Sequence, residues 1–303
     1  MEDVELVIKI PEGLKKDFES EQWTALSCME MKDALEKATP LPKGHGDLKD
    51  ISKIDYQSGC FISSEGEPIP IIHKIATIEM IRDWLPTIIE ALRKQTPIQY
   101  IFGHTDWMGM RLKVTHDTLI PRPETAELID WILTTCDTQS PLRVMDIGTG
   151  SGCIAIALKK KCPIWQVQGI DISSEALEVA KMNAQENNVD IEWKRLDILS
   201  ETSEQVDIIV SNPPYICNRE KVDMDARVLD YEPHTALFVP DNDPLLFYRR
   251  IASIKIARSI FFEINEAYRN EVCDMMQSLG YIDIQLKTDI YGKPRMVFGR
   301  IKV

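Results

Sequence analysis

The stretch RVMDIGTGSGC, residues 143–153, decides the fold of this chain. Its apolar first half is typical of a buried strand, and its glycines form a turn from which a helix begins. Such a turn lets a ligand approach the main chain closely, and the free N–H groups at the helix N-terminus attract an anion such as a carboxylate. The dinucleotide pattern G-x-G-x-x-G would require glycine where Cys153 stands. The stretch therefore predicts a turn that binds a nucleotide-like cofactor, against the alternative of a turn without a ligand; its residues are Gly148, Thr149, Gly150, Ser151 and Gly152.

Segments typical of strands and helices alternate on both sides of this turn. The predicted strands are residues 142–148, 164–171, 191–197, 206–212 and 256–265, followed by a closing antiparallel pair, 282–289 and 295–301. The predicted helices between them are residues 124–136, 151–161, 173–188 and 270–280. Alternation of this kind predicts an α/β fold with a doubly wound, mostly parallel seven-stranded sheet, whose ligands bind at the carboxyl ends of the strands.

The part of the chain before residue 119 has a different character. Residues 1–95 predict a helical N-terminal domain for substrate recognition, with helices over 71–95 that break near Pro86. Residues 96–118 are rich in aromatic and β-branched side chains and contain Gly103 and Gly109, which predicts a β-hairpin linker. The cofactor-binding domain is then expected over residues 119–303.

Carboxylates stand at the ends of the next two predicted strands. Asp171 follows the glycine-rich turn by about 20 residues, where a carboxylate accepts both hydroxyls of a ribose. Asp197, with Ile198 after it, ends the third strand and is expected to meet the edge of an adenine. Either carboxylate alone is more often a helix cap or a loop residue. Three consecutive strand ends that each carry the expected group favour an adenosyl cofactor.

The fourth predicted strand ends in Asn212-Pro213-Pro214-Tyr215. The two prolines form a stiff turn and have no N–H groups. The Asn212 carboxamide oxygen and the Pro213 carbonyl can therefore accept both hydrogens of a target –NH2, while Tyr215 covers its flat face. A planar nitrogen is a weak nucleophile, so its methylation depends on positioning in line with a sulfonium methyl. The motif predicts an S-adenosylmethionine-dependent methyltransferase in which Asn212, Pro213, Pro214 and Tyr215 are catalytic and bind the substrate.

Composition excludes several other classes of protein. The net charge is −13, with 12 Lys and Arg against 18 Asp and Glu in residues 1–95, so no direct contact with nucleic acid is expected. No apolar run reaches the roughly 18 residues of a membrane span, and no transit or signal peptide is visible. The seven cysteines contain no C-x-x-C pair, which favours a reducing intracellular compartment and no metal site.

With these motifs in order, residues from about 97 to the end resemble the HemK/PrmC family of release-factor glutamine N5-methyltransferases. The resemblance rests on PIQYIFG, LIPRPET (119–125), DIGTGSG, SNPPYI, Tyr231-Glu232-Pro233 with Ala236-Leu237, and Glu263 in FFEIN. It also includes Asp289, Gly292 and Arg295 near the C-terminus. The segment LIPRPET separates this family from the broader class that shares the NPPY motif.

The resemblance implies a class I methyltransferase fold and a reaction in translation termination. S-adenosylmethionine is the implied cofactor, and the implied partner is a peptide chain release factor, methylated on the glutamine of its Gly-Gly-Gln motif. Leu119 is implied to lie near the transferred methyl group, and Arg122 to organise the junction with the substrate. A monomer is expected.

The chain departs from the family pattern at Ala126, at Phe238-Val239-Pro240-Asp241-Asn242, at Asn265 and at Tyr268. These departures concern substrate docking and resemble a diverged mitochondrial member, so the mitochondrial matrix is expected, with the cytoplasm as the alternative. Two other functions stay open: an adenine-N6 methyltransferase, whose target poses the same geometric problem, and a non-catalytic cofactor-binding subunit. The acidic charge disfavours the first, and the intact NPPY motif disfavours the second.

Overall fold

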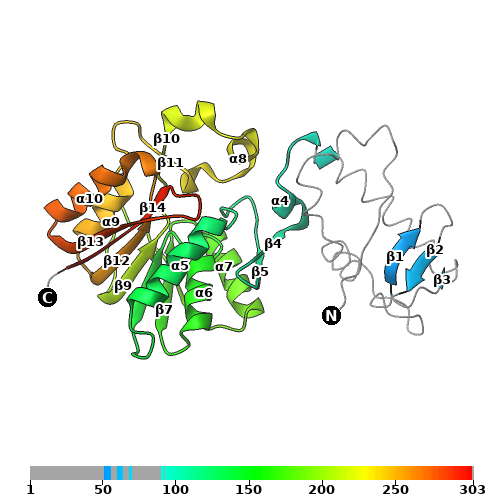
Figure 1. The fold of residues 1–303 in the computed structure, drawn as a ribbon, viewed down its shortest axis with the longest axis horizontal. Coiled ribbons are helices and arrows are strands. Elements are labelled where there is room, and N and C mark those ends of the chain that lie inside the picture. Colours follow the sequence, from blue (N-terminus) through cyan, green and yellow to red (C-terminus); the bar gives the residue numbers. More distant parts are fainter. Residues whose placement is uncertain (1–50, 56–59, 64–67, 70–89, 92, 302–303) are drawn as a thin grey trace. The chain divides into compact units, whose positions relative to one another are not determined.

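A computed structural model describes residues 51–55, 60–63, 68–69, 90–91 and 93–301. The chain divides into two compact units, Met1–Phe102 and Gly103–Val303, so the boundary falls inside the predicted linker (Figure 1). In the first unit, three strands that the sequence did not predict form an antiparallel sheet: β1 (Ile51–Asp55), β2 (Cys60–Ser63) and β3 (Pro68–Ile69). Most of the helices expected over 71–95 lie outside the described residues. Among the described helices, none has the length and apolar character to cross a bilayer.

The second unit is built on a seven-stranded sheet in the order β13-β14-β12-β9-β6-β7-β8. The five strands from β12 to β8 are parallel, and β14 pairs antiparallel with both β12 and β13. The seven predicted strands are confirmed with small shifts at their ends. Their bounds are β6 (Arg143–Ile147), β7 (Gln166–Asp171), β8 (Glu192–Arg195), β9 (Val206–Ser211), β12 (Ala257–Glu263), β13 (Tyr281–Thr288) and β14 (Pro294–Ile301).

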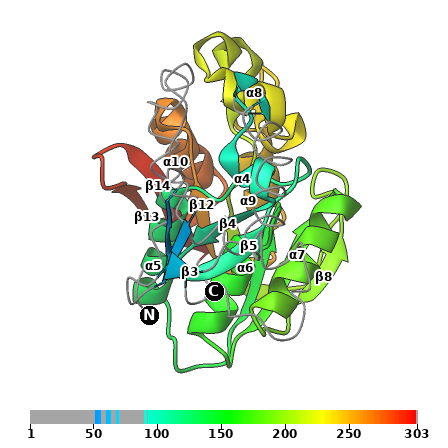
Figure 2. The ribbon, with the colours of Figure 1, turned by 90° about the vertical axis from the view of Figure 1, so that its right-hand side faces the viewer.

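Helices cover both faces of this sheet (Figures 1 and 2). Successive side chains of a strand point to opposite faces, and the core follows that period: Ile208 and Val210 pack with α5 and α6, whereas Ile209 packs with α9 and α10. The central strands β6 and β9 are therefore buried on both faces, whereas the edge strands β8 and β13 are largely exposed. The helix bounds are α5 (Pro123–Thr135), α6 (Cys153–Lys161), α7 (Ser174–Glu186), α9 (Leu246–Ser253) and α10 (Arg269–Ser278). The sequence did not predict α9.

The predicted hairpin linker is correct only in part. β4 (His104–Trp107) and β5 (Met110–Lys113) pair antiparallel around Met108 and Gly109, whose φ angles of 50° and 70° are those of a two-residue type I′ turn. The preceding residues Ile98–Phe102, expected as part of the hairpin, instead form the short helix α4. Pro97 accounts for the helix, because its carbonyl accepts from Tyr100 and Ile101 while its missing N–H is not needed in a first turn.

The hairpin belongs to the second unit, where α7 holds its main chain. Asn183, fully buried on α7, accepts from Lys113 N at 2.6 Å and donates to Lys113 O at 3.0 Å. Its amide also donates to Ser151 O in the glycine-rich turn at 2.8 Å. One turn later, Asn187 donates to Arg111 O at 3.0 Å. The Asn183 side chain therefore connects the hairpin directly to the predicted cofactor turn.

We expect Asn183→Leu to lower the free energy of unfolding by about 3 kcal/mol, because it leaves three main-chain groups without partners. Urea unfolding followed by tryptophan fluorescence measures this loss. Gln185→Leu, at an exposed position on the same helix, is the control and should change stability by less than about 0.5 kcal/mol. Equal losses in the two variants would contradict the role of Asn183 as a connection between hairpin and turn.

Candidate active site

A cavity of about 360 Å³ lies at the carboxyl edge of the parallel strands. Most of the residues predicted from the sequence line it together: Leu119, Arg122, Gly148, Thr149, Gly150, Ser151, Asp171, Asp197, Ile198, Asn212, Pro213 and Pro214. Gly152 and Tyr215 are not among the lining residues. The sequence reading missed Thr125 and Phe238, and it missed Phe247 and Ile251 on α9, whose apolar spacing in LLFYRRIASI is helical.

The glycine-rich turn uses its glycines for two different purposes. Gly148 and Gly150 have φ angles of 72° and 55°, and no atom lies within 4 Å of the place where a Cβ would stand. Their main chain is therefore open to the cavity. Gly152 also has a positive φ of 80°, but a Cβ there would lie 3.0 Å from the Trp193 ring and 3.1 Å from Ala180. The structure thus gives Gly152 a packing role, and its predicted contact with the cofactor stays a prediction.

Asp171 lies at the end of β7, beside the turn. One carboxylate oxygen accepts from Gly150 N at 2.9 Å and the other accepts from Ser173 N at 3.0 Å. Burial raises the pKa of this carboxyl, and the main-chain donors oppose that shift. Each oxygen keeps a further lone pair for a ligand hydroxyl. Asp171 therefore fixes the shape of the turn and still offers acceptors to the cavity.

Asp197 begins the turn that follows β8. Its two carboxylate oxygens accept from Leu199 N and from the Ser200 hydroxyl, both at 2.9 Å. These bonds are those of a residue that caps a local turn. Since Asp197 and Ile198 both line the cavity, a nearby ligand would meet the remaining lone pairs of the carboxylate and the apolar Ile198 side chain.

Behind the NPPY motif lies a buried polar network that the sequence did not reveal. The Asn212 amide donates to Thr125 Oγ1 at 3.4 Å, and that hydroxyl donates to Glu263 Oε2 at 2.7 Å. The Tyr215 hydroxyl donates to the other oxygen of Glu263 at 3.3 Å. Burial raises the pKa of Glu263, while the Thr125 hydrogen bond and the Arg295 charge act against that shift. The Tyr215 hydroxyl thus belongs to this network, and the position of its ring over the target nitrogen stays a prediction.

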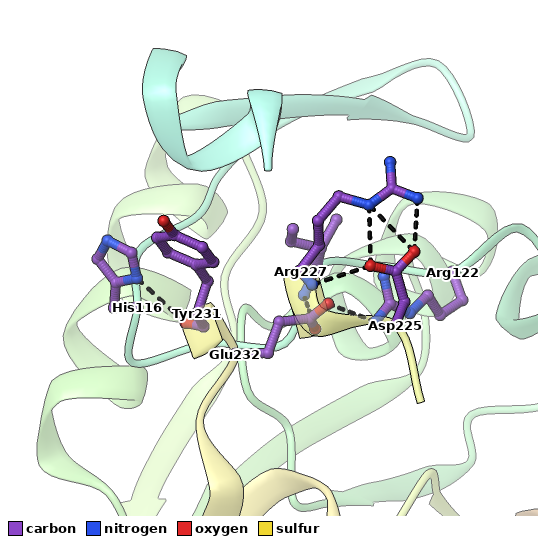
Figure 3. Close-up of polar contacts among 7 residues, drawn as sticks. His116, Arg122, Asp225, Arg227, Tyr231 and Glu232 are labelled. Atoms are coloured by element: carbon purple, nitrogen blue, oxygen red, sulfur yellow. Dashed lines mark hydrogen bonds and ion pairs between the residues drawn. The ribbon is translucent and has the colours of Figure 1, made fainter. Parts of the chain in front are cut away.

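Arg122 anchors the segment of residues 119–125 to the end of α8 (Ala226–Tyr231), as Figure 3 shows. Arg122 forms an ion pair at 2.5 Å with Glu232, whose side chain is only 1% exposed. Glu232 also accepts from Ile120 N at 3.4 Å, and the Trp107 indole donates to Arg122 O at 2.9 Å. The segments LIPRP and YEP, far apart in the sequence, therefore meet beside the cavity that Leu119, Pro121 and Arg122 line.

Two of the departures from the family pattern, Val239 and Asn265, lie beside the chain that leaves the NPPY motif. Val239 is in β11 (Phe238–Val239), which pairs parallel with β10 (Ile216–Cys217). The Asn265 amide donates to Tyr215 O and to Glu220 Oε1, both at 3.2 Å. Val239 and Asn265 therefore support the main chain that leaves the motif. Ala126 packs against the core that includes α5.

Residues 93–301 and the other described segments contain no group of three His, Cys, Asp or Glu residues that could hold a metal ion. The site instead consists of an open glycine turn, strand-end carboxylates and the NPPY motif.

This sheet order and a ligand cavity at its carboxyl edge define the protein as a class I methyltransferase. Residues 129–230 match the family model of the methyltransferase small domain. The crystal structure of the hMettl16 catalytic domain in complex with MAT2A 3'UTR hairpin 6 has the same fold, with a TM-score of 0.52 at 14% identity over 89% of this chain and 92% of that chain.

The chain belongs to the release factor glutamine methyltransferase family. A release factor glutamine methyltransferase of Bacteroides thetaiotaomicron is 46% identical over 221 residues, which cover 70% of this chain and 79% of that protein. Another from Streptococcus pneumoniae is 39% identical over 268 residues, which cover 86% of this chain and 91% of that protein. The family that the sequence motifs suggested is thereby confirmed.

Proposed function

We propose that this enzyme transfers a methyl group from S-adenosylmethionine to the side-chain amide nitrogen of a glutamine in the Gly-Gly-Gln motif of a peptide chain release factor. The single observation that carries the proposal is that Asn212 and Pro213 line the same cavity as the open glycine turn. A cofactor on that turn and an amide at Asn212 would then lie side by side. The relatives named for this reaction support the choice of substrate.

The residues of the cavity fit S-adenosylmethionine. The open main chain at Gly148 and Gly150 is suited to the amino-acid end, Asp171 to the ribose hydroxyls, and Asp197 with Ile198 to the adenine. The cofactor supplies a methyl group on a positively charged sulfur. The protein has no need of a strong base, because its task is to hold the amide nitrogen in line with that methyl group.

The substrate side of the cavity is suited to a single primary amide. The Asn212 Oδ1 and Pro213 carbonyl would accept the two N–H groups of the glutamine, which fixes its plane. Leu119 and Arg122 line the same wall and would border the side chain as it enters. A glutamine side chain is long enough to reach into such a cavity, and flanking glycines let the partner's main chain come close. The first unit, Met1–Phe102, would supply further binding to the partner. Mitochondrial localisation and a monomeric state stay predictions.

The test is incubation of the enzyme with S-adenosylmethionine and a release factor, followed by peptide mass spectrometry. We expect one added methyl group, on the glutamine of the Gly-Gly-Gln motif, and no labelling after that glutamine is replaced by asparagine. An RNA pool and a DNA pool in parallel reactions are the controls. Methyl groups on adenine with an unmodified release factor would overturn the proposal.

We expect Asp171→Ala to weaken S-adenosylmethionine binding by about 1–3 kcal/mol, because ribose hydroxyls and Gly150 N lose their acceptor. Isothermal titration calorimetry measures the change. Asp130→Ala, at an exposed position on α5, is the control and should bind the cofactor as the wild type does. Unchanged affinity in the Asp171 variant would remove this residue from the ribose site.

A further inference from the structure

Glu263, at the carboxyl end of β12, is the centre of a hydroxyl cluster behind the cavity. Glu263 is only 2% exposed, and it is not one of the residues that line the cavity. Thr125 Oγ1 lies 2.7 Å from one carboxylate oxygen and the Tyr215 hydroxyl lies 3.3 Å from the other. The Tyr248 hydroxyl donates to the main-chain oxygen of the same residue at 3.1 Å. A buried carboxylate with a hydroxyl donor on each oxygen is placed to accept and not to donate.

The direction of these hydrogen bonds determines which way the Asn212 carboxamide points. A hydroxyl has one hydrogen, and the Thr125 hydrogen goes to Glu263. Thr125 Oγ1 can then only accept from Asn212, so the group that faces it at 3.4 Å is the Asn212 NH2. The Asn212 Oδ1 is consequently the atom left for the cavity. A carboxamide turned by 180° would present NH2 to the target NH2, and two donors do not bond.

The same carboxylate also holds the far end of the motif. The Tyr215 hydroxyl is bound to Glu263, and the Tyr215 carbonyl accepts from the Asn265 amide at 3.2 Å. Both ends of the Asn212–Tyr215 turn are therefore attached to the segment that begins at the end of β12. Two prolines between these ends leave the turn little freedom.

We propose that Glu263 is a positioning residue for methyl transfer: through the Thr125 hydroxyl it orients Asn212 Oδ1 toward the target amide, and through the Tyr215 hydroxyl it fixes the far end of the turn. This inference rests on the proposed function, since the target is taken to be a primary amide. Glu263 acts without touching substrate or cofactor. Its effect is on the geometry of transfer and not on how tightly either ligand binds.

The test compares Thr125→Val, which has the same shape without a hydroxyl, with Thr125→Ser, which keeps one. We expect the valine variant to lower kcat on the release factor roughly 10- to 100-fold, with the release-factor KM and the cofactor Kd within about twofold of wild type. The serine variant should recover most of the rate. Glu263→Gln should also lower kcat, since its amide can donate to Thr125 and reverse the bond. Thr134→Val, at an exposed position on the same helix, is the matched control.

A second measurement does not depend on the substrate. In protein labelled with 15N-asparagine, assigned with an Asn212→Ala sample, the Asn212 side-chain amide hydrogens should exchange slowly with water. Exchange should become faster in Thr125→Val and stay slow in Thr125→Ser. The positioning role of Glu263 would be overturned if Thr125→Val and Thr125→Ser had the same kcat and the same hydrogen-exchange rate at the Asn212 side-chain amide. If wild-type enzyme leaves the release factor unlabelled, the proposed function fails, and the exchange measurement alone then decides whether Glu263 orients Asn212.

Discussion

Asn212→Ala should lower the rate of methyl transfer by roughly a hundredfold or more, because the target amide loses the acceptor that fixes its plane. The expected loss is in kcat, since the carboxamide contributes orientation to a weakly nucleophilic nitrogen. Single-turnover labelling of the release factor, with the cofactor in excess, measures the step directly. Asn270→Ala, at an exposed position, is the control. Near-normal turnover in the Asn212 variant would contradict the amide-clamp mechanism.

The companion variant Asn212→Asp should also be poor, for a reason that the structure makes specific. An aspartate cannot donate to Thr125 Oγ1, whose hydrogen is already given to Glu263. The new carboxylate would face a hydroxyl that has only lone pairs to offer, with the Glu263 charge behind it. A variant that keeps the size of the side chain therefore fails on charge and hydrogen-bond direction.

Arg122→Leu should lower the free energy of unfolding by about 3–5 kcal/mol, because it leaves the Glu232 carboxylate buried without its cation. The two partners are unequally exposed: the exposed fraction of the side chain is 33% for Arg122 and 1% for Glu232. The opposite variant, Glu232→Leu, should therefore cost less, since Arg122 can reach water. Urea unfolding of the two single variants measures the difference.

The double variant Arg122→Leu with Glu232→Leu is the control for this ion pair. It removes both charges, so it should be more stable than Arg122→Leu alone. A double variant as unstable as the sum of the two single variants would show that the ion pair does not couple them. In that case the segments LIPRP and YEP are held together by packing.

Much of the sheet could be predicted because its signals are local. Strands β6 and β9 are short, mostly apolar runs, and the predicted ligand-binding residue of each strand from β6 to β9 lies at its end or within two positions after it. The carboxyl ends of parallel strands share one edge, so Gly148, Asp171, Asp197 and Asn212 were expected together, and all four line one cavity.

The parts that could not be predicted depend on contacts between distant residues. Glu263 and Thr125 are 138 positions apart, and neither has a local pattern that announces a buried hydrogen bond. The spacing of the motif includes Gly152, but the reason for a glycine at this position is the close packing of the Trp193 ring, which comes from β8. The composition of residues 96–118 places α4 in the hairpin linker, because five residues are too few for a helical period to stand out from aromatic and β-branched neighbours.

The contact of Asn183 with both Lys113 and Ser151 has a consequence for chimaeric enzymes built from members of this family. A hairpin transplanted from another family member together with its N-terminal segment would have to form hydrogen bonds with Asn183 on α7 of the host. A hairpin that does not fit would move the Asn183 side chain, which also holds Ser151 in the glycine-rich turn. The joint in such a chimaera therefore belongs between Phe102 and Gly103, before the hairpin. Exchanging residues 1–102, for which partner binding is proposed, would then leave the supports of the methyl-donor site in place.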